Sequence, residues 1–435
     1  MKNVDYLIIG AGITGLSLAY HLNGQDYEVY ESEKSAGGMC RTENFCGFYF
    51  DYGEHFMRAD EPYVRELICN LLGQNLESQP INAAIYLGGQ VTNYPFQTNL
   101  FGLRPDIIKS CLVGYVNAWC SQQKKPRSVP NNFEEWIYSS FGEGIAKYFM
   151  IPYNEKIWTI HPRDMTVDWF FNDSVVPRGN LEAVIEGALE RREQKQNMRW
   201  YPLKGGINSL SEAFLKHVKN VSFNKKAIDV DPANKKVTFS DGEIVQYKIL
   251  LSTIPLPQLI SLIADAPSVI KKAASSLKYN SVFIVNLGIE REKISPYHWM
   301  YFPESSFIFA RCYFLTNFSP FMAPKNCSSV SAMITYSEHK PLDKVKIVEK
   351  VTENLIQANI IKPNDKILAN SVTDVKYGFN IFTHDRRQNV ELIKKYLVGN
   401  YTYSIGRYGN WEYSGIEHSI LNSRELVHSL VKDKK

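Results

Sequence analysis

The sequence of 435 residues lacks the features of membrane, disulfide-rich and nucleic-acid-binding proteins. No apolar run is long enough to cross a bilayer, so we expect no membrane span. The seven cysteines are odd in number and form no CxxC pair or cysteine–histidine metal spacing, which predicts reduced thiols and no metal site. The net charge is only +4, and the lysine-rich stretches 124–127 and 432–435 are typical of solvated loops and termini. We therefore expect no nucleic-acid partner.

Two further absences bear on localisation and organisation. The chain begins directly with a strand-like segment, which leaves no room for a signal peptide, and with reduced cysteines this predicts a cytoplasmic protein. No internal repeat and no low-complexity segment is visible. Because a chain of this length is too long for one core, we expect two or three domains.

What the sequence does contain begins in its first 40 residues. Residues 4–9 are an apolar run that indicates a buried parallel strand, and the turn 10–15 follows at once with the spacing GxGxxG. A short helix pattern and a second apolar strand, residues 27–30, lead to Glu31, about 20 residues after the first glycine. Strand, turn, helix, strand and acid in this order are typical of a dinucleotide-binding motif, with an ordinary glycine turn as the alternative.

Each residue of this motif has a physical role. Gly10 permits the tight turn, Gly12 lets the backbone approach a pyrophosphate, and Gly15 lets the helix pack closely on the strand. The amides at the start of the helix, beside Thr14, point at the phosphates, where the helix dipole favours negative charge. Glu31 can accept hydrogen bonds from a ribose.

A second glycine turn narrows the choice of dinucleotide. Gly37 and Gly38 are followed by Arg41, and this turn resembles one that flavoproteins of the amine-oxidase and glutathione-reductase type carry at the same place. The resemblance implies FAD rather than NAD, with Gly38 and Arg41 among the residues that bind it. The physics of the motif alone fixes only a dinucleotide. No second glycine motif for NADPH or NADH is visible, so the reductant stays open.

The remaining pattern predicts an α/β fold in which a Rossmann-like domain is interrupted by two other domains. A helical insert beside a nucleotide-binding sheet is a common way to enclose a substrate cleft. The predicted parts are a discontinuous FAD domain of residues 1–80, 201–275 and 390–435, a helical insert domain of residues 100–200, and an antiparallel β-sheet domain of residues 81–99 and 276–389.

Several elements are predicted with definite bounds. A hairpin is expected about Gly88-Gly89. Asn132 and Glu135 have the spacing of a capping box that opens a helix. The strands and helices expected around these signals are strands 84–87, 90–94, 282–289, 306–314 and 330–336, and helices 107–120, 181–196, 344–358 and 416–430.

Longer motifs across nearly the whole chain resemble the UDP-galactopyranose mutase family, nearest its eukaryotic-type branch. They come in the family's order and comprise the glycine fingerprint, YPFQ at 94–97, FMIPYNEKIW at 149–158, KGG at 204–206, WMYFPE at 299–304, Arg311 and GRYGNWEY at 406–413. The resemblance implies an amine-oxidase-like FAD fold and a pyranose–furanose mutase that acts on a nucleotide sugar such as UDP-galactopyranose. In that family the reduced flavin acts through N5 as a nucleophile at the anomeric carbon, in the service of cell-surface polysaccharide biosynthesis.

The resemblance also implies the residues of the site. The catalytic candidates are His55, Arg311 and Tyr413. Further FAD contacts are expected from His55, Gly205, Gly206, Gly406 and Arg407. Substrate contacts are expected from Tyr94, Gln97, Asn154, Trp158, Arg178, Trp299, Tyr301, Arg311 and Tyr413. The alternatives are a structural role for His55, a salt bridge to a local acid for Arg311, and core packing for the aromatic residues.

The sequence departs from the family at four places. Asp173 stands where the family has a second diphosphate-binding arginine, and an acid facing a diphosphate is unfavourable, so we expect Arg178 to substitute. Phe379 stands where the family has a tyrosine, and Glu54 stands where it has a glycine before the flavin histidine. The loop 414–416 is shorter than the family's. A paralogue with another nucleotide sugar is therefore open.

Two other functions fit the same motifs. One is an FAD-dependent oxidase or dehydrogenase of the amine-oxidase or protoporphyrinogen-oxidase-like group, which consumes an electron acceptor with each turnover. The other is a flavin protein that binds a nucleotide sugar without turning it over. A mutase, by contrast, returns the redox state of its substrate. The sugar, the base and the oligomeric state are not fixed by the sequence.

Overall fold

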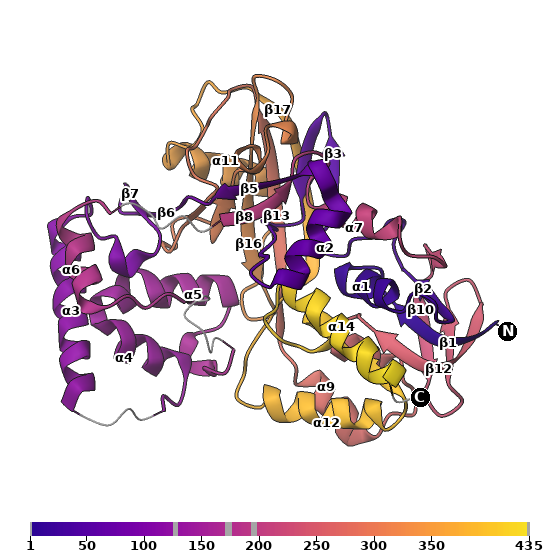
Figure 1. Ribbon diagram of the computed structural model, residues 1–435. Helices are drawn as coiled ribbons and strands as arrows, with labels where there is room; N and C mark the ends of the chain where they lie inside the picture. The colour runs from indigo at the N-terminus through magenta and orange to yellow at the C-terminus, as the bar shows by residue number, and fades with distance from the viewer. Residues whose placement is uncertain (1, 125–128, 170–175, 193–197, 433–435) are drawn as a thin grey trace.

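A computed structural model describes residues 2–124, 129–169, 176–192 and 198–432. Figure 1 shows a parallel sheet covered by helices on the right, a second large sheet in the upper centre, and a lobe of helices on the left. The predicted α/β fold, with a helical insert beside two sheets, is confirmed.

The first sheet is built around strand β1 (Lys2–Ile9), which pairs in parallel with β2 (Tyr27–Tyr30) on one side and β12 (Ile244–Ser252) on the other. Residues of β1 alternate between two cores, because successive side chains in a strand point to opposite faces. Tyr6 and Ile8 belong to one core and Leu7 and Ile9 to the other. The other strands of this sheet are β9 (Val221–Ser222) beside β2, β18 (Thr402–Ser404) beside β12, and the antiparallel β10 (Ala227–Asp231) and β11 (Lys236–Phe239).

Helices cover both faces of this sheet, as a parallel sheet with two apolar faces requires. Helices α1 (Ile13–His21) and α14 (Ile416–Lys432) lie side by side on the Tyr6 face (Figure 1). Helices α9 (Ser268–Ser275) and α12 (Arg386–Val398) contribute apolar residues to the core on the opposite face. Helix α12 carries no apolar run that the sequence analysis recognised, and it crosses the boundary placed between residues 389 and 390.

The second sheet is antiparallel except where β6 (Ala83–Leu87) and β14 (Trp299–Tyr301) pair in parallel. Helix α11 (Ile347–Gln357) contributes to the core on one of its faces. The hairpin predicted about Gly88-Gly89 is confirmed, whereas the predicted strand 306–314 is reduced to β15 and the longest strand, β17, was not predicted. The strand order is β17 (Ile367–Asn380), β13 (Tyr279–Ile289), β16 (Ser328–Tyr336), β15 (Arg311–Tyr313), β14 (Trp299–Tyr301), β6 (Ala83–Leu87) and β7 (Gln90–Asn93).

The insert opens its second helix with the predicted cap. The Asn132 side chain accepts a hydrogen bond from the Glu135 amide at 2.9 Å, and the Glu135 carboxylate accepts one from the Asn131 amide at 3.0 Å. The helix predicted over 181–196 is wrong in extent, because α6 ends at Leu189. The helices of the insert are α3 (Pro105–Lys124), α4 (Phe133–Ile145), a π-helical segment (Ala146–Met150), α5 (Ile151–Trp158) and α6 (Leu181–Leu189).

Smaller elements join these three parts. They are the ribbon of β3 (Thr42–Phe45) and β4 (Phe48–Asp51), the ribbon of β5 (Leu76–Pro80) and β8 (Met198–Pro202), and helices α2 (Pro62–Leu72), α7 (Asn208–Leu215), α8 (Leu256–Ser261), α10 (Leu315–Phe318) and α13 (Gly406–Gly409).

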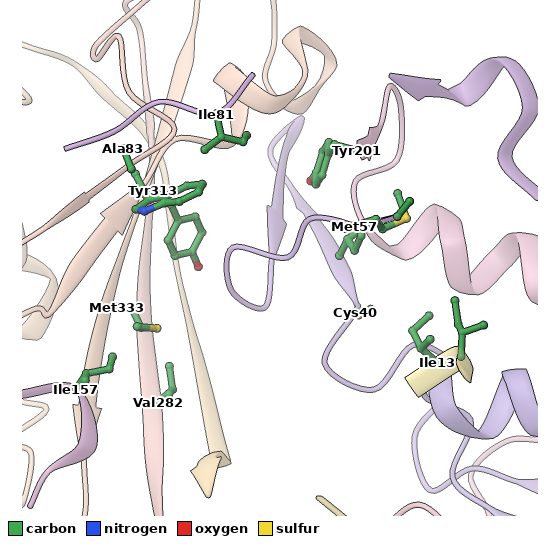
Figure 2. Packing of buried hydrophobic residues seen from close by; sticks show 14 of the residues in the cluster. Ile13, Cys40, Met57, Ile81, Ala83, Ile157, Tyr201, Val282, Tyr313 and Met333 are labelled. Atoms are coloured by element: carbon green, nitrogen blue, oxygen red, sulfur yellow. The ribbon is translucent and has the colours of Figure 1, made fainter. Parts of the chain in front are cut away.

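One apolar core runs through all three parts of the molecule. Figure 2 shows its members Tyr313 and Met333 on the second sheet, Ile157 in the insert and Ile13 on α1. Because a single core joins these segments, the division into domains stays a prediction. Among the described helices none is long and apolar enough to span a bilayer, and the cysteines are all free thiols.

The Lys156 side chain fastens the insert to the second sheet. Its ammonium group is almost fully buried and donates to the carbonyl oxygens of Phe302 at 2.9 Å and Glu304 at 2.7 Å. Burial lowers the pKa of Lys156 to about 7, and the charge of Lys340 acts in the same direction. Two motifs far apart in sequence, FMIPYNEKIW and WMYFPE, thus meet at one buried amino group.

We predict that Lys156→Met destabilises the protein by about 1–3 kcal/mol, because two buried carbonyl oxygens lose their donor. Urea unfolding followed by circular dichroism measures the change. Lys147→Met is the matched control, since Lys147 is exposed on the same lobe and surface changes stay within about 0.5 kcal/mol. Equal unfolding midpoints for the two variants would refute this role for Lys156.

Candidate functional site

The first glycine turn is held by contacts that leave no room for side chains. Gly10 has a φ of +98°, and a Cβ atom added to Gly15 would lie 1.9 Å from the Gly10 carbonyl oxygen. Gly12 differs, because its φ of −70° is ordinary and its Cβ atom would meet nothing in the described chain closer than 3.7 Å. Gly15 therefore serves helix packing, and Gly12 keeps space open before the start of α1.

Glu31 directly follows β2, and its buried carboxylate ties the turn together. One oxygen accepts from the Ala11 amide at 2.6 Å, and the other accepts from the Glu33 amide at 2.9 Å and the Ser32 hydroxyl at 3.1 Å. The predicted acid is thus at the nucleotide turn. It also has a structural role that the ribose prediction did not include.

The second glycine turn lies against the first. The Gly37 amide donates to the Ala11 carbonyl at 2.9 Å, and a Cβ atom on Gly38 would lie 3.2 Å from the Gly12 Cα. Arg41 donates through Nε to the Gly38 carbonyl at 2.9 Å. The two turns therefore form one backbone surface at the start of α1, where helix amides without a side-chain cap suit a pyrophosphate.

The glycine pair Gly205-Gly206 lies on a buried acid, Asp51, which the sequence analysis did not predict. Asp51 ends β4 fully buried and accepts from the hydroxyls of Thr42, at 2.6 Å, and Tyr201. Burial raises the pKa of Asp51 to about 7. A Cβ atom on Gly206 would lie 2.7 Å from the Asp51 Oδ1, so Gly205-Gly206 passes directly over the acid. The signal in the sequence is an acid that closes the apolar strand β4.

The C-terminal glycine and arginine lie close to the first turn. A Cβ atom on Gly406 would lie 2.5 Å from the Thr14 Oγ1, and the Ser423 hydroxyl of α14 donates to the Thr14 carbonyl at 3.2 Å. Arg407 is half-buried and donates to the Ser414 carbonyl at 3.2 Å. Its Nε has no hydrogen-bond partner within the described part of the chain. The expected flavin contacts Thr14, Gly406 and Arg407 are therefore in one place.

His55 lies on the same side as Arg407. Burial lowers the pKa of His55 to about 4, and the positive charge of Arg407 acts in the same direction. The imidazole is neutral at physiological pH as a result, and its Nδ1 has no partner among the residues that the structure describes. These two unpaired nitrogens, with the joined glycine turns and the uncapped helix start, fit a bound FAD.

Aromatic rings gather beside Arg311. The Tyr301 ring lies 5.0 Å from that of Tyr94 and 5.1 Å from that of Tyr153, and the Arg311 guanidinium lies 5.7 Å from the Tyr301 ring. Burial raises the pKa of Tyr94 to about 12 and raises those of Tyr153 and Tyr301 well above the ordinary value, so all three are neutral donors. Tyr153 was not assigned to the site, although it stands inside the FMIPYNEKIW run.

Arg311 has an acidic partner in this structure. Its guanidinium forms an ion pair with the carboxylate of Glu54, as the alternative of a salt bridge to a local acid anticipated. Burial lowers the pKa of Arg311 to about 10, which leaves it charged at neutral pH. The cation expected to hold a diphosphate thus meets Glu54, one of the positions where the sequence is expected to depart from the family that it resembles.

Three of the expected substrate residues have internal partners. The Asn154 amide donates to the Met150 carbonyl at 2.7 Å, and its oxygen accepts from the Trp158 indole at 3.2 Å. Gln97 donates to the carbonyl of Pro177, next to Arg178. These contacts order the wall of the insert, and a substrate contact by Asn154, Trp158 or Gln97 stays a prediction.

Trp299 is also tightly packed. Its ring is almost fully buried and stacks on Phe56 at 5.5 Å, with Phe318 on the same stack at 6.4 Å. This packing favours the core alternative for Trp299. Phe56 follows His55 directly, so the stack connects β14 with the segment that carries the candidate flavin histidine.

The remaining substrate candidates lie at the edge of the insert. Tyr413 is 41% exposed, with the Arg407 guanidinium 5.0 Å from its ring. That guanidinium also lies 5.4 Å from the ring of Phe379, the residue that replaces a family tyrosine. Arg178 lies over the Trp136 ring at 5.3 Å. Asp173 lies outside the described residues. The expectation that Arg178 takes over the role of the arginine missing at position 173 therefore stays a prediction.

Comparison with known proteins identifies the family. The family described as flavin containing amine oxidoreductase matches residues 13–371. The chain belongs to this family. Its cofactor is accordingly FAD, in agreement with the turns described above.

Individual relatives have low sequence identity to this chain, and one solved structure has a very similar fold. A crystal structure of reduced UDP-galactopyranose mutase is similar with a TM-score of 0.93 and 26% identity, over 99% of this chain and 94% of that one. A probable UDP-galactopyranose mutase of Klebsiella pneumoniae is 25% identical over 38% of this chain and 44% of its own. Protoporphyrinogen oxidase 2 of Arabidopsis thaliana is 22% identical over 50% and 48%. The chain spans less than half of the length of these two curated relatives.

We predict that Gly12→Ala yields a folded protein that has lost most of its FAD. The new methyl group meets no close protein atom but occupies the space of a pyrophosphate. The cost in stability should be about 1 kcal/mol or less. Flavin absorbance after gel filtration, with circular dichroism of the same sample, measures both effects. Gly399→Ala should keep its FAD, and a fully loaded Gly12→Ala would contradict the assignment.

We predict that Asp51→Asn removes a pH dependence of stability between about pH 4 and pH 7. The folded pKa near 7 lies above the unfolded value, so folded Asp51 binds a proton that the unfolded chain releases. Raising the pH through this window therefore destabilises the wild type, by at most about 1.4 kcal/mol per pH unit.

Urea unfolding at several pH values should show the wild type losing its advantage over Asp51→Asn as the pH rises. Asp60→Asn removes an exposed acid nearby in the chain and should run parallel to the wild type. Parallel profiles for Asp51→Asn and wild type would mean that Asp51 is already ionised throughout.

Proposed function

We propose that this protein is an FAD-dependent pyranose–furanose mutase that acts on a nucleotide sugar of the UDP-galactopyranose type. The observation that supports it best is the similarity to reduced UDP-galactopyranose mutase, which extends over 99% of this chain and 94% of that one at a TM-score of 0.93. The amine-oxidase family alone would be equally consistent with an oxidase.

The chemistry of the side chains around Arg311 supports an anionic ligand. Arg311 is a charged fork of donors, and guanidinium groups suit phosphate. The hydroxyls of Tyr94, Tyr153 and Tyr301 stay protonated because burial raises their pKa values, so they donate without adding negative charge. Diphosphate oxygens would be bound by such a set, and a leaving diphosphate would be held for its return.

The flavin side supplies the reactive group next to this set. Reduced flavin would provide a nucleophile for the anomeric carbon, and Arg407 with the neutral His55 would stabilise and orient the ring from the protein side. The packed stack of Trp299 and Phe56 would keep water from the sugar. The electron source is open between NADPH, NADH and another reductant.

An oxidase or dehydrogenase of the amine-oxidase or protoporphyrinogen-oxidase-like group is the alternative. The match to protoporphyrinogen oxidase 2 of Arabidopsis thaliana and the Glu54–Arg311 pair favour it, because an ion pair presents less net charge to a phosphate than a free arginine does. A third possibility, binding of a nucleotide sugar without turnover, is decided by the same assay.

We predict that dithionite-reduced protein interconverts UDP-galactopyranose and UDP-galactofuranose without consuming an oxidant, and that oxidised protein does not. Anion-exchange chromatography separates the two sugars. Arg311→Ala should weaken UDP-sugar binding by about 1.5–3 kcal/mol, the range of a hydrogen bond to a charged group. Oxygen consumption with peroxide release on a substrate would favour the oxidase, and UDP binding without conversion would favour a binding protein.

A further inference from the structure

Glu54 and Arg311 form an ion pair between segments 257 residues apart in sequence. Their side chains are only 11% and 14% exposed, so neither charge is well hydrated. A buried arginine needs an anionic partner, because removing one member of such a pair leaves an uncompensated charge. In the free protein, Glu54 supplies that partner from within the chain.

The pair lies where the substrate's phosphate is expected. Arg311 faces the Tyr301 ring, and its pKa is influenced by Tyr413 and Arg407 on the flavin side. Its Nε has no hydrogen-bond partner within the described residues, whereas the NH1 edge is taken by Glu54. The guanidinium therefore keeps a buried donor without a partner, and an anion that reached Arg311 while Glu54 is bound would meet a carboxylate of like charge.

The position of Glu54 in the chain makes its competition effective. It directly precedes His55, the candidate flavin histidine, and follows Gly53, whose φ is +135°. A carboxylate tethered this close to its partner has a high effective concentration, so it competes with a free ligand even when each contact is of ordinary strength. The mutase family, which the chain resembles, has a glycine at this place and no such competitor.

We propose that Glu54 is an internal occupant of the anion site, a specificity-determining residue that a ligand phosphate must displace from Arg311. This inference rests on the proposed function, since it concerns the same site. It predicts that the site around Arg311 binds simple anions weakly. Anions bind well there only when their other contacts offset the displacement of Glu54. A ligand without phosphate is not affected by Glu54 in this way.

The test is calorimetric titration of the oxidised holoprotein with UDP, uridine and inorganic pyrophosphate. Glu54→Gln and Glu54→Gly are compared with wild type, and FAD content and circular dichroism verify that each variant is folded. Glu61→Gln is the matched control, because it removes the same charge from an exposed position nearby in the chain. Arg311→Ala and the double variant Arg311→Ala with Glu54→Gln complete the cycle.

We expect both Glu54 variants to bind UDP about tenfold to a hundredfold more tightly than wild type, the range of one charged hydrogen bond regained by the ligand. Uridine affinity should stay unchanged, and Glu61→Gln should behave as wild type. In the Arg311→Ala background the Glu54 change should give no comparable gain, because the cation that both anions share is absent.

Two results separate the inference from the proposed function. If wild type binds UDP and interconverts the sugars, but neither Glu54 variant binds UDP more tightly, the inference is overturned and the mutase proposal stands. If no form binds UDP, but the Glu54 variants bind pyrophosphate more tightly than wild type, the internal occupant stands and the nucleotide-sugar substrate is overturned. Failure of every form to bind either ligand overturns both.

Discussion

The close contact between helix α1 and strand β1 is the constraint on which the rest of the structure depends. At Gly15 the helix approaches the Gly10 carbonyl so closely that even a methyl group would collide with it. This approach fixes where α1 starts, and the start of α1 fixes the space before Gly12. The second turn, at Gly37-Gly38, then rests on the first through one backbone hydrogen bond. The C-terminal segment is positioned against the first turn, because Gly406 lies directly beside Thr14.

Segments that are far apart in the chain are joined by a different kind of contact. Buried polar groups join them, since an unpaired donor or charge in a core is costly. The Lys156 ammonium joins the insert to the second sheet through two carbonyl oxygens. Asp51 joins the ribbon of β3 and β4 to the strand that carries Tyr201. Steric fit thus sets the approach of α1 to β1, and satisfaction of buried polar groups joins the more distant segments.

How much the sequence could predict follows from this difference. The glycine motif, Glu31, the hairpin and the Asn132 cap are local signals with fixed spacings, and the structure has all of them. Strand β17 was missed because only some of its residues are buried, so it lacks an apolar run, and α12 was missed because it is strongly polar. The ion pair of Glu54 with Arg311 links positions 257 residues apart, and no spacing rule reaches that far.

The position of α14 has a consequence for the order of events during synthesis. The helix is made last among the described elements, yet it packs beside α1 and its Ser423 hydroxyl donates to the Thr14 carbonyl in the first turn. Strand β12, the neighbour of β1, also comes from the middle of the chain. During synthesis, the side of α1 that packs against α14 therefore has no cover from this helix until residues 416–432 have been made.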